Sequence, residues 1–174
     1  GGRRFSFTAL VIVGDGPDRA MLQRRLPDAV FLGHLTGDAL AEAVAGFDVF
    51  VHPGESETFG QTIQEAMASA VPVVATGRGG PVDLVRSSVD GWLYRPGDLG
   101  DLRARVADLV GDPAKRRAFG AAARESVAPR SWATLSDALV GHYARAARLR
   151  TLDDARRVRV HPLPSPRPVP AETA

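Results

Sequence analysis

The sequence of 174 residues contains no cysteine, which excludes disulfide bonds and thiolate metal sites. Lys115 is the only lysine, and because it does not follow a glycine-rich loop, a P-loop nucleotide site is excluded as well. No stretch approaches the roughly 18 consecutive apolar residues of a membrane-spanning helix. The four histidines show no ligand spacing, so no structural metal ion is expected. The absence of cysteine fits a location in the cytoplasm.

Basic residues are also scarce outside the C-terminal end of the chain. The net charge is +2, but residues 145–174 carry seven arginines against three acids, which leaves residues 1–144 with a net charge of −2. That longer part has no basic face with interleaved aromatic residues, so a nucleic-acid surface is not expected. With 44% apolar and 24% charged residues, the composition is typical of a globular protein with one domain.

Short apolar runs alternate with segments of helical pattern. The runs predict strands buried in a parallel sheet, and the segments between them carry apolar residues at helical spacing. The predicted fold is an α/β structure with a doubly wound parallel sheet, followed by C-terminal helices that Asp98, Asp112 and Ser131 cap. The expected strands cover residues 8–13, 29–32, 48–51, 71–75 and 91–94, and the expected short helices cover 18–26, 38–44 (capped by Asp38) and a segment that begins at Gly80-Pro81.

The two ends of the chain differ from this pattern. Residues 1–7 are expected to be a non-native or remnant segment, and residues 8–148 to form the domain. Residues 149–174 are expected to form a basic, flexible tail, because residues 161–174 hold five prolines in fourteen positions.

The stretch VHPGESETFGQTIQEAMASAVPVVA (51–75) predicts a strand end, an acidic loop, a helix and a second strand. Glu57 and Glu65 stand eight positions apart, and Phe59-Gly60 lies where the helix is expected to begin. The start of a helix has free N–H groups that can bind phosphate, and Gly60 allows a ligand to approach the backbone. Acids near a helix start are also favoured by the helix dipole, so the pattern alone fits a solvated helix end equally well. The residues expected to be buried on the opposite side of this helix are Ile63, Ala66, Met67 and Ala70.

Ligands of a doubly wound sheet bind beyond the carboxyl ends of its strands, where loops 14–17, 33–37, 52–60 and 76–80 are expected. The turn Gly14-Asp15-Gly16 invites an NAD-binding interpretation. That fingerprint fails, because Arg19 stands where Gly or Ala is needed and no acid ends the next strand. His52 fits two interpretations equally well, a contact to a bound sugar or a residue held extended before a proline.

The segment ETFGQTIQEAMASAVPVVA, followed by GRGGPVDLV, resembles the E-x7-E region of the retaining family 4 glycosyltransferases. The resemblance implies the two-domain GT-B architecture, of which this chain would be the C-terminal, donor-binding domain. Within this family, the amino-acid sequence is most similar to those of bacterial GDP-mannose-dependent α-mannosyltransferases that act on lipid acceptors. Matching pieces cover roughly residues 8–148 in the family's order: LVIVGDGP (10–17), VFLGHL (30–35), FDVFVHPGESETFG (47–60), DGWLYRPGD (90–98) and Ser131-Trp132.

The resemblance also implies roles for residues. Glu57 would contact hydroxyls of the transferred hexose and is the catalytic candidate, and Glu65 would hold the ribose hydroxyls. The donor would be a nucleotide sugar such as GDP-mannose, with no metal or other cofactor, and the acceptor a lipid or glycan. A peripheral position at the inner face of the cell membrane would fit such an acceptor. The remaining implied donor-binding residues are Thr58, Phe59, Gly60 and Gln61 in the acidic loop and helix, and Gly14, Leu32 and Gly33 on the nucleotide side.

The chain departs from the family pattern in two ways. The N-terminal acceptor domain and the first strand of this domain, with its basic pair for the diphosphate, have no counterpart, although Arg3 or Arg4 could be a remnant of that pair. Ala70 also stands where the family has glycine. We therefore expect the chain alone to transfer no sugar. A nucleotide-sugar epimerase and a non-catalytic nucleotide-binding remnant are the alternatives.

Overall fold

The structure is a computed structural model that describes residues 9–157. It divides into two compact units, Gly1–Pro129 and Arg130–Ala174. The remnant expected at 1–7 and the proline-rich segment 161–174 lie outside the described residues.

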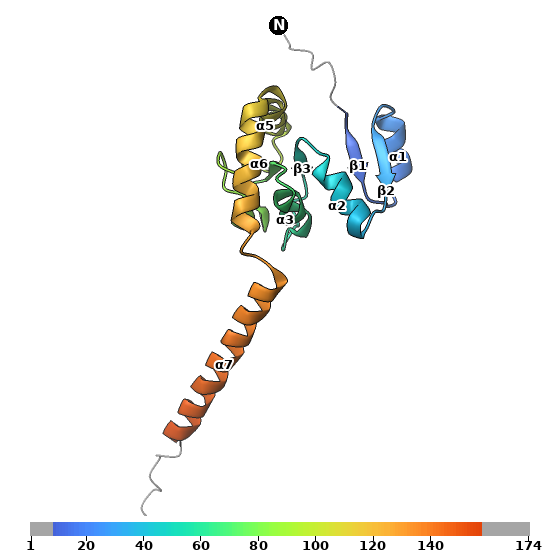
Figure 1. Cartoon of the computed structure of the whole chain (residues 1–174). Coiled ribbons are helices and arrows are strands. Elements are labelled where there is room, and N and C mark those ends of the chain that lie inside the picture. The colour runs from blue at the N-terminus through green and yellow to red at the C-terminus, as the bar shows by residue number, and fades with distance from the viewer. Residues whose placement is uncertain (1–8, 158–174) are drawn as a thin grey trace, which may run out of the picture. The chain divides into compact units, whose positions relative to one another are not determined.

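The first unit alternates strands and helices as the sequence predicts (Figure 1). Most expected strands prove shorter than their apolar runs, because only part of each run pairs with a neighbour. In chain order the elements are β1 (Val11–Val13), α1 (Arg19–Arg25), β2 (Val30–Gly33), α2 (Gly37–Ala45), β3 (Phe50–His52), α3 (Gln61–Ala68), β4 (Val73–Thr76), α4 (Pro81–Leu84), β5 (Gly91–Tyr94), α5 (Leu99–Gly111) and α6 (Pro113–Val127).

Every strand pair in the described residues is parallel, which confirms the predicted fold class. The strands fall into two sheets, one with β1 beside β2 and one in the order β3-β4-β5. In the second sheet Phe50 pairs with Val73, and Val73 pairs with Gly91. The carboxyl ends of β3, β4 and β5 therefore lie at one edge, where the acidic loop follows β3.

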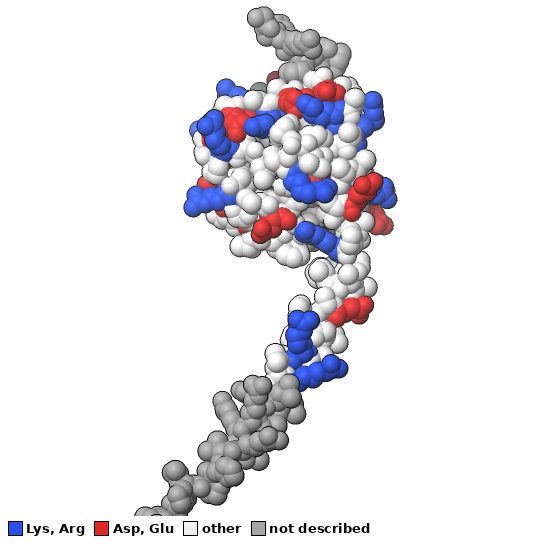
Figure 2. Space-filling view, turned by 90° about the vertical axis from the view of Figure 1, so that its left-hand side faces the viewer, with Lys and Arg blue, Asp and Glu red and all other residues white. Residues whose placement is uncertain are grey.

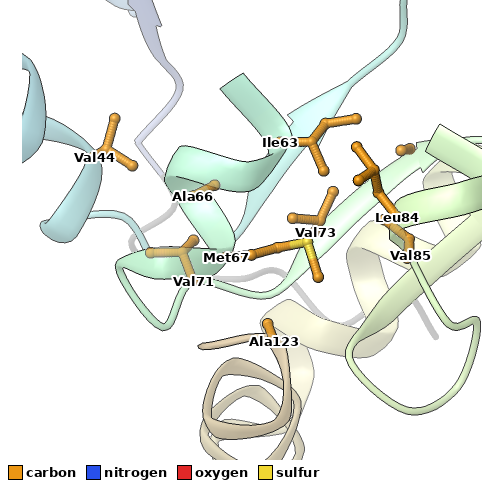
Figure 3. Close-up of a cluster of buried hydrophobic side chains, with 10 residues drawn as sticks. Val44, Ile63, Ala66, Met67, Val71, Val73, Leu84, Val85 and Ala123 are labelled. Carbon is orange, nitrogen blue, oxygen red and sulfur yellow. The ribbon is translucent and has the colours of Figure 1, made fainter. Parts of the chain in front are cut away.

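Helices cover both faces of the β4 strand, as in a doubly wound sheet. On one face Val73 and Ala75 join a cluster with α3, which contributes the fully buried Ile63 and Met67 (Figure 3). On the other face Val74 packs in a second cluster with Leu109 of α5. Each fully buried aliphatic side chain of this size contributes about 1.5–3 kcal/mol to folding, so β4 and α3 form the stable base of the acidic loop.

Two sequence predictions are wrong, one about a helix cap and one about burial. Asp38 does not cap α2: the helix begins one residue earlier, and Thr36 holds the N-cap position. Ala70 is exposed instead of buried, because it lies just beyond the end of α3 with a φ of 59°. There its N–H donates to the carbonyl of Met67 (3.0 Å), and the N–H of Val71 donates to the carbonyl of Ala66 (3.0 Å). This hydrogen-bond pair is the Schellman ending of a helix.

The predicted caps of the later helices are confirmed. The Asp98 carboxylate accepts a hydrogen bond from the N–H of Asp101 (2.9 Å), and Asp112 accepts one from the N–H of Lys115 (2.9 Å).

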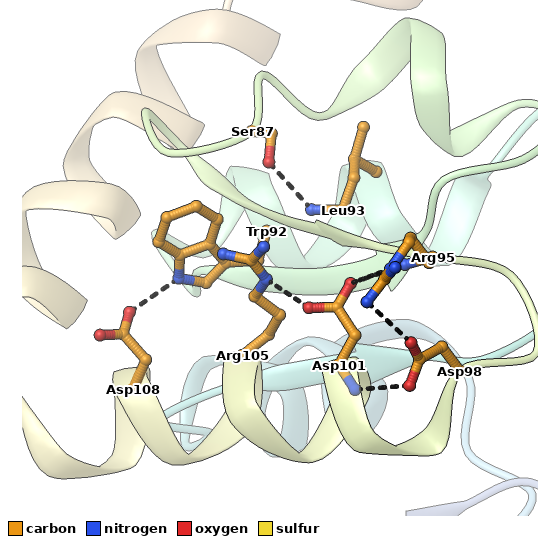
Figure 4. Close-up of polar contacts among 8 residues, drawn as sticks. All are labelled: Ser87, Trp92, Leu93, Arg95, Asp98, Asp101, Arg105 and Asp108. Atoms are coloured by element: carbon orange, nitrogen blue, oxygen red, sulfur yellow. Dashed lines mark hydrogen bonds and ion pairs between the residues drawn. The ribbon is translucent and has the colours of Figure 1, made fainter.

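A polar network ties β5 to α5 (Figure 4). The indole N–H of Trp92 donates to Asp108 (2.8 Å), and the Arg105 guanidinium lies 4.4 Å above the same ring. Asp101 accepts from Arg105 (3.0 Å) and from the N–H of Arg95 (2.9 Å). The loop after β5 is thereby fixed on the first turns of α5.

The second unit contains one helix, α7 (Trp132–Arg157), among its described residues. The hydroxyl of Ser131 accepts a hydrogen bond from the N–H of Thr134 (3.1 Å), which confirms the predicted cap. The helix continues past residue 148, where the sequence pattern weakens. Among the residues that the structure describes, no helix has both the length and the apolar character needed to cross a membrane.

Candidate functional site

The acidic loop between β3 and α3 folds around the Glu57 side chain. Glu57 Oε1 accepts hydrogen bonds from the N–H groups of Phe59 (2.9 Å) and Gly60 (2.7 Å). These hydrogen bonds, that of Gly60 first, hold the pKa of the Glu57 carboxyl below its ordinary value. Both amides that were expected to meet a ligand are therefore engaged by a carboxylate of the same loop.

His52 ends β3 beneath this loop. Its Nε2 lies 3.7 Å from Glu57 Oε2, and its side chain is only 16% exposed. The buried Nδ1 has no hydrogen-bond partner among the described residues. The imidazole of His52 therefore lies next to the carboxylate of Glu57, which the sequence analysis names as the catalytic candidate.

Gly79 and Gly80 allow the loop after β4 to pack against the acidic loop. The N–H of Gly80 donates to the carbonyl of Glu57 (2.8 Å). A Cβ on Gly79 would lie 2.7 Å from the Glu57 carbonyl oxygen, and one on Gly80 would lie 2.5 Å from that of Thr58. Real Cβ atoms do not approach so closely, so the backbone of loop 76–80 can contact the acidic loop only because these residues are glycines.

Gly60 has a role in the fold itself. Its φ is +67°, and a Cβ there would lie 2.4 Å from Leu84 Cδ1. The sequence suggested that Gly60 admits a ligand; the structure adds that it forms a left-handed turn before α3 and packs against α4.

Glu65 lies on the same side of α3 as Gln61, as the sequence predicts. The Gln61 amide Nε2 donates to Glu65 Oε1 (3.0 Å), and Glu65 is half-buried. Thr58 and Phe59 are exposed at the helix start, with Phe59 54% exposed. Glu65 therefore keeps one carboxylate oxygen, Oε2, without a hydrogen bond to the described residues.

The residues expected on the nucleotide side gather at the carboxyl ends of β1 and β2. The N–H of Gly14 donates to the carbonyl of Gly33 (2.7 Å), and Leu32 is exposed beside it. Arg19, which pairs with Asp15 at 3.4 Å, would lie 3.2 Å from a Cβ on Gly33. No hydrogen bond or ion pair between described side chains or backbone joins this group to Glu57 or Glu65.

Sequence reasoning missed Arg78. Its Nη1 pairs with Glu55 Oε2 at 3.3 Å and so bridges the loops that follow β4 and β3. The signal that could have found it is its position, since it lies in one of the four loops expected at the carboxyl ends of the strands. Within the described part of the chain, no group of three or more His, Asp or Glu residues is placed to hold a metal ion.

Comparison with known proteins identifies the class to which this arrangement belongs. The family model described as "Glycosyl transferases group 1" matches residues 3–126. The chain is a member of this glycosyltransferase family, which confirms the resemblance seen in the sequence.

Two mycobacterial relatives refine the comparison. The chain is 54% identical over 144 residues to the GDP-mannose-dependent alpha-mannosyltransferase of Mycolicibacterium smegmatis, and 48% identical over 147 residues to the enzyme of that name in Mycobacterium tuberculosis. The matches cover 82% and 84% of this chain. The chain spans only 38% of the length of either relative, so it corresponds to a part of such a protein.

Solved structures agree on the fold. Sucrose-phosphate synthase from Thermosynechococcus elongatus superposes with a TM-score of 0.69 at 28% identity, over 79% of this chain and 39% of that one. TarM from S. aureus, solved in a complex that includes UDP, superposes with a TM-score of 0.66 at 25% identity, over 72% of this chain and 26% of that one.

Proposed function

We propose that this chain is the donor-binding part of a retaining glycosyltransferase that transfers mannose from GDP-mannose to a lipid or glycan acceptor. The observation that supports this most is the acidic loop and helix, where Glu57 and Glu65 flank the start of α3. The similarity to enzymes named as GDP-mannose-dependent mannosyltransferases supports the donor and does not favour an epimerase or a non-catalytic remnant.

The two carboxylates would have different tasks. Glu57 Oε1 organises the helix start, so Oε2 is the oxygen that would accept a hydroxyl of the transferred mannose. Glu65 would accept the ribose hydroxyls, and Gly14, Leu32 and Gly33 would border the nucleotide. Carboxylates suit these tasks because each oxygen can accept more than one hydrogen bond.

The proposed transfer needs no protein base. The bond between the sugar C1 and the phosphate oxygen breaks, and a bond between C1 and the acceptor oxygen forms on the same face. The acceptor proton passes to the departing diphosphate. The protein then has to stabilise leaving-group charge, a task for hydrogen-bond donors and cations at the site.

The donor part alone would lack an acceptor site, which we assign to an N-terminal domain. Two of the described strands each have an unpaired edge that a further strand could join, because β1 pairs only with β2 and β3 only with β4. Apolar residues beside these open edges are exposed, among them Leu10 and Val51. A strand of the N-terminal part would cover them. We place the protein in the cytoplasm, where nucleotide sugars are available.

A chimera tests this proposal. Residues 1–174 replace the matching 38% of the Mycolicibacterium smegmatis relative, and the purified chimera receives labelled GDP-mannose with a lipid acceptor. Mannosyl transfer that Glu65→Ala reduces, and that EDTA leaves unchanged, is the expected result. A folded chimera that transfers no mannose, while the intact relative does, would contradict the proposal.

A further inference from the structure

The candidate site has an excess of negative charge where a negatively charged ligand is proposed. Glu55, Glu57 and Glu65 lie in the loop and helix after β3, and no Lys or Arg occurs between His52 and Thr76. The face of the molecule drawn in Figure 2 carries mixed charge, with blue and red side chains interspersed. The backbone N–H groups of Phe59 and Gly60 cannot offset the excess, since they already donate to Glu57. A nucleoside diphosphate held here needs a cation, and the two that the sequence analysis offered, Arg3 and Arg4, lie outside the described residues.

Arg78 is the cationic side chain in loop 76–80. The backbone on both sides of it is held in place. The N–H of Gly77 donates to the carbonyl of Tyr94 (2.8 Å), and that of Gly80 donates to the carbonyl of Glu57 (2.8 Å). The Arg78 side chain itself is 67% exposed. The backbone of Arg78 is therefore held beside the acidic loop, while its guanidinium is exposed to solvent.

The contact that Arg78 makes is a weak one. Its Nη1 lies 3.3 Å from Glu55 Oε2, and both side chains are exposed. An exposed ion pair of this kind contributes little to stability, because water screens both charges. A phosphate group carries more charge than a carboxylate and can accept two parallel hydrogen bonds from a guanidinium. An ion pair between Arg78 and a phosphate group is thus expected to be more favourable than the ion pair with Glu55.

We propose that Arg78 is a donor-binding residue whose guanidinium leaves Glu55 and binds the diphosphate of the nucleotide. This inference rests on the proposed function. In the transfer step, the same guanidinium would face the charge that develops on the departing diphosphate. Glu55 acts as an internal partner that holds Arg78 beside the empty site and competes with the nucleotide.

The test is a set of titrations of the 174-residue chain with GDP and with guanosine, which has no phosphate. Arg78→Ala is expected to weaken GDP binding by about 10–100-fold, the range of a lost hydrogen bond to a charged group. Guanosine binding is expected to stay unchanged. Arg78→Lys keeps the charge without the planar fork and is expected to give an intermediate loss. Glu55→Gln removes the competing carboxylate and is expected to tighten GDP binding.

The matched control is Arg103→Ala, which removes an exposed arginine from α5 and changes the net charge equally. GDP affinity that is the same in the Arg78 and Arg103 variants overturns the inference and leaves the proposed function intact. Weaker GDP binding by Glu55→Gln also overturns it, since Arg78 would then only join two loops. If the unmodified chain binds neither GDP nor UDP, the proposed function fails and this inference fails with it. Thermal unfolding of each variant separates these outcomes from a loss of folding.

Discussion

At the scale of single residues, Glu57 of the acidic loop and Glu65 of α3 make different contacts. Glu57 organises the start of α3 through two backbone hydrogen bonds, whereas Glu65 contacts one side-chain amide. Loss of the Glu57 carboxylate would therefore disturb the loop as well as a ligand. Loss of the Glu65 carboxylate removes only one hydrogen bond within the described residues, so substitution of Glu65 tests ligand binding with less effect on the loop.

Glu65→Ala is expected to weaken GDP binding by about 1.5–3 kcal/mol, the contribution of a hydrogen bond to a charged group. The thermal midpoint should change little, because Glu65 is not in the core that Ile63 and Met67 form. Calorimetric titration measures the affinity. Glu42→Ala, which removes an exposed acid from α2, serves as the control. Equal GDP affinity in both variants would remove Glu65 from the site.

Ala70→Gly is expected to stabilise the protein. Ala70 has a φ of 59°, a conformation that costs a residue with a Cβ about 1–2 kcal/mol relative to the usual helical region. Part of this gain is lost because glycine has a more flexible unfolded state. Chemical denaturation should show a higher midpoint, and Ala68→Gly, within α3, should show the opposite shift. A destabilised Ala70→Gly would mean that the Schellman ending is not strained.

Asp108 is expected to make stability depend on acidity. The hydrogen bond from Lys115, and after it the one from Trp92, holds the pKa of this carboxyl below its ordinary value of 3.8. Its contribution is therefore fully present above that value and is lost as the pH falls through the lower pKa of the folded state. Asp108→Asn should lower the thermal midpoint at neutral pH, with a difference that shrinks below about pH 4. A difference that stays constant with pH, like that of the exposed Asp28→Asn control, would contradict this.

The sequence predicted the burial and contacts of some residues correctly and of others not, for physical reasons. Ile63 and Met67 were predicted as buried because helical spacing alone places them on one face. Ala70 was wrongly predicted as buried, because the same spacing continues past the residue where the helix ends. The pairing of Arg78 with Glu55 joins positions 23 apart in the chain, and no local pattern encodes such a contact.

At the scale of elements, the α3–α6 packing depends on one glycine. Gly120 of α6 lies against the end of α3, where a Cβ would come within 2.1 Å of the Ala70 carbonyl oxygen. The neighbouring Ala123 belongs to the same buried cluster as Met67. The two helices can approach this closely only without a side chain at position 120.

Gly120→Ala is therefore expected to destabilise the protein by about 1–3 kcal/mol, the usual cost of overpacking a core. Gly141→Ala in α7 is the matched control, since a Cβ there meets nothing within 4 Å. That control should be neutral or stabilising, because alanine favours helix over glycine by about 1 kcal/mol. Denaturation midpoints measure both. Equal effects of the two changes would show that α6 can move away without cost.

The elements themselves were predicted well, and their grouping was not. Apolar runs and capping residues such as Asp98 and Asp112 placed the strands and helices, because these signals are local. The division into sheets of two and three strands is not local, since it depends on which strand edges find a partner. The acidic loop was predicted as a site. The hydrogen bonds from its N–H groups to Glu57 were not predicted, because they depend on the left-handed conformation of Gly60, which no sequence pattern specifies.

At the scale of the whole molecule, the chain corresponds to only part of the length of its relatives. Membership of the glycosyltransferase family rests on residues 3–126, and the chain spans 38% of the length of its mycobacterial relatives. Positioning two reactants together can supply about 7–11 kcal/mol of a reaction barrier. A chain that holds only the donor loses that advantage. We expect residues 1–174 to bind a nucleoside diphosphate weakly and to transfer no sugar.

The measurement that tests this account most directly is a calorimetric titration of the 174-residue chain with GDP, followed by incubation with labelled GDP-mannose and a glycolipid acceptor. The account predicts saturable GDP binding that Glu65→Ala weakens, together with no mannosyl transfer by the isolated chain. A folded chain that binds neither GDP nor UDP would contradict the donor-binding assignment. Mannosyl transfer by this chain alone would contradict the assignment of the acceptor site to another domain.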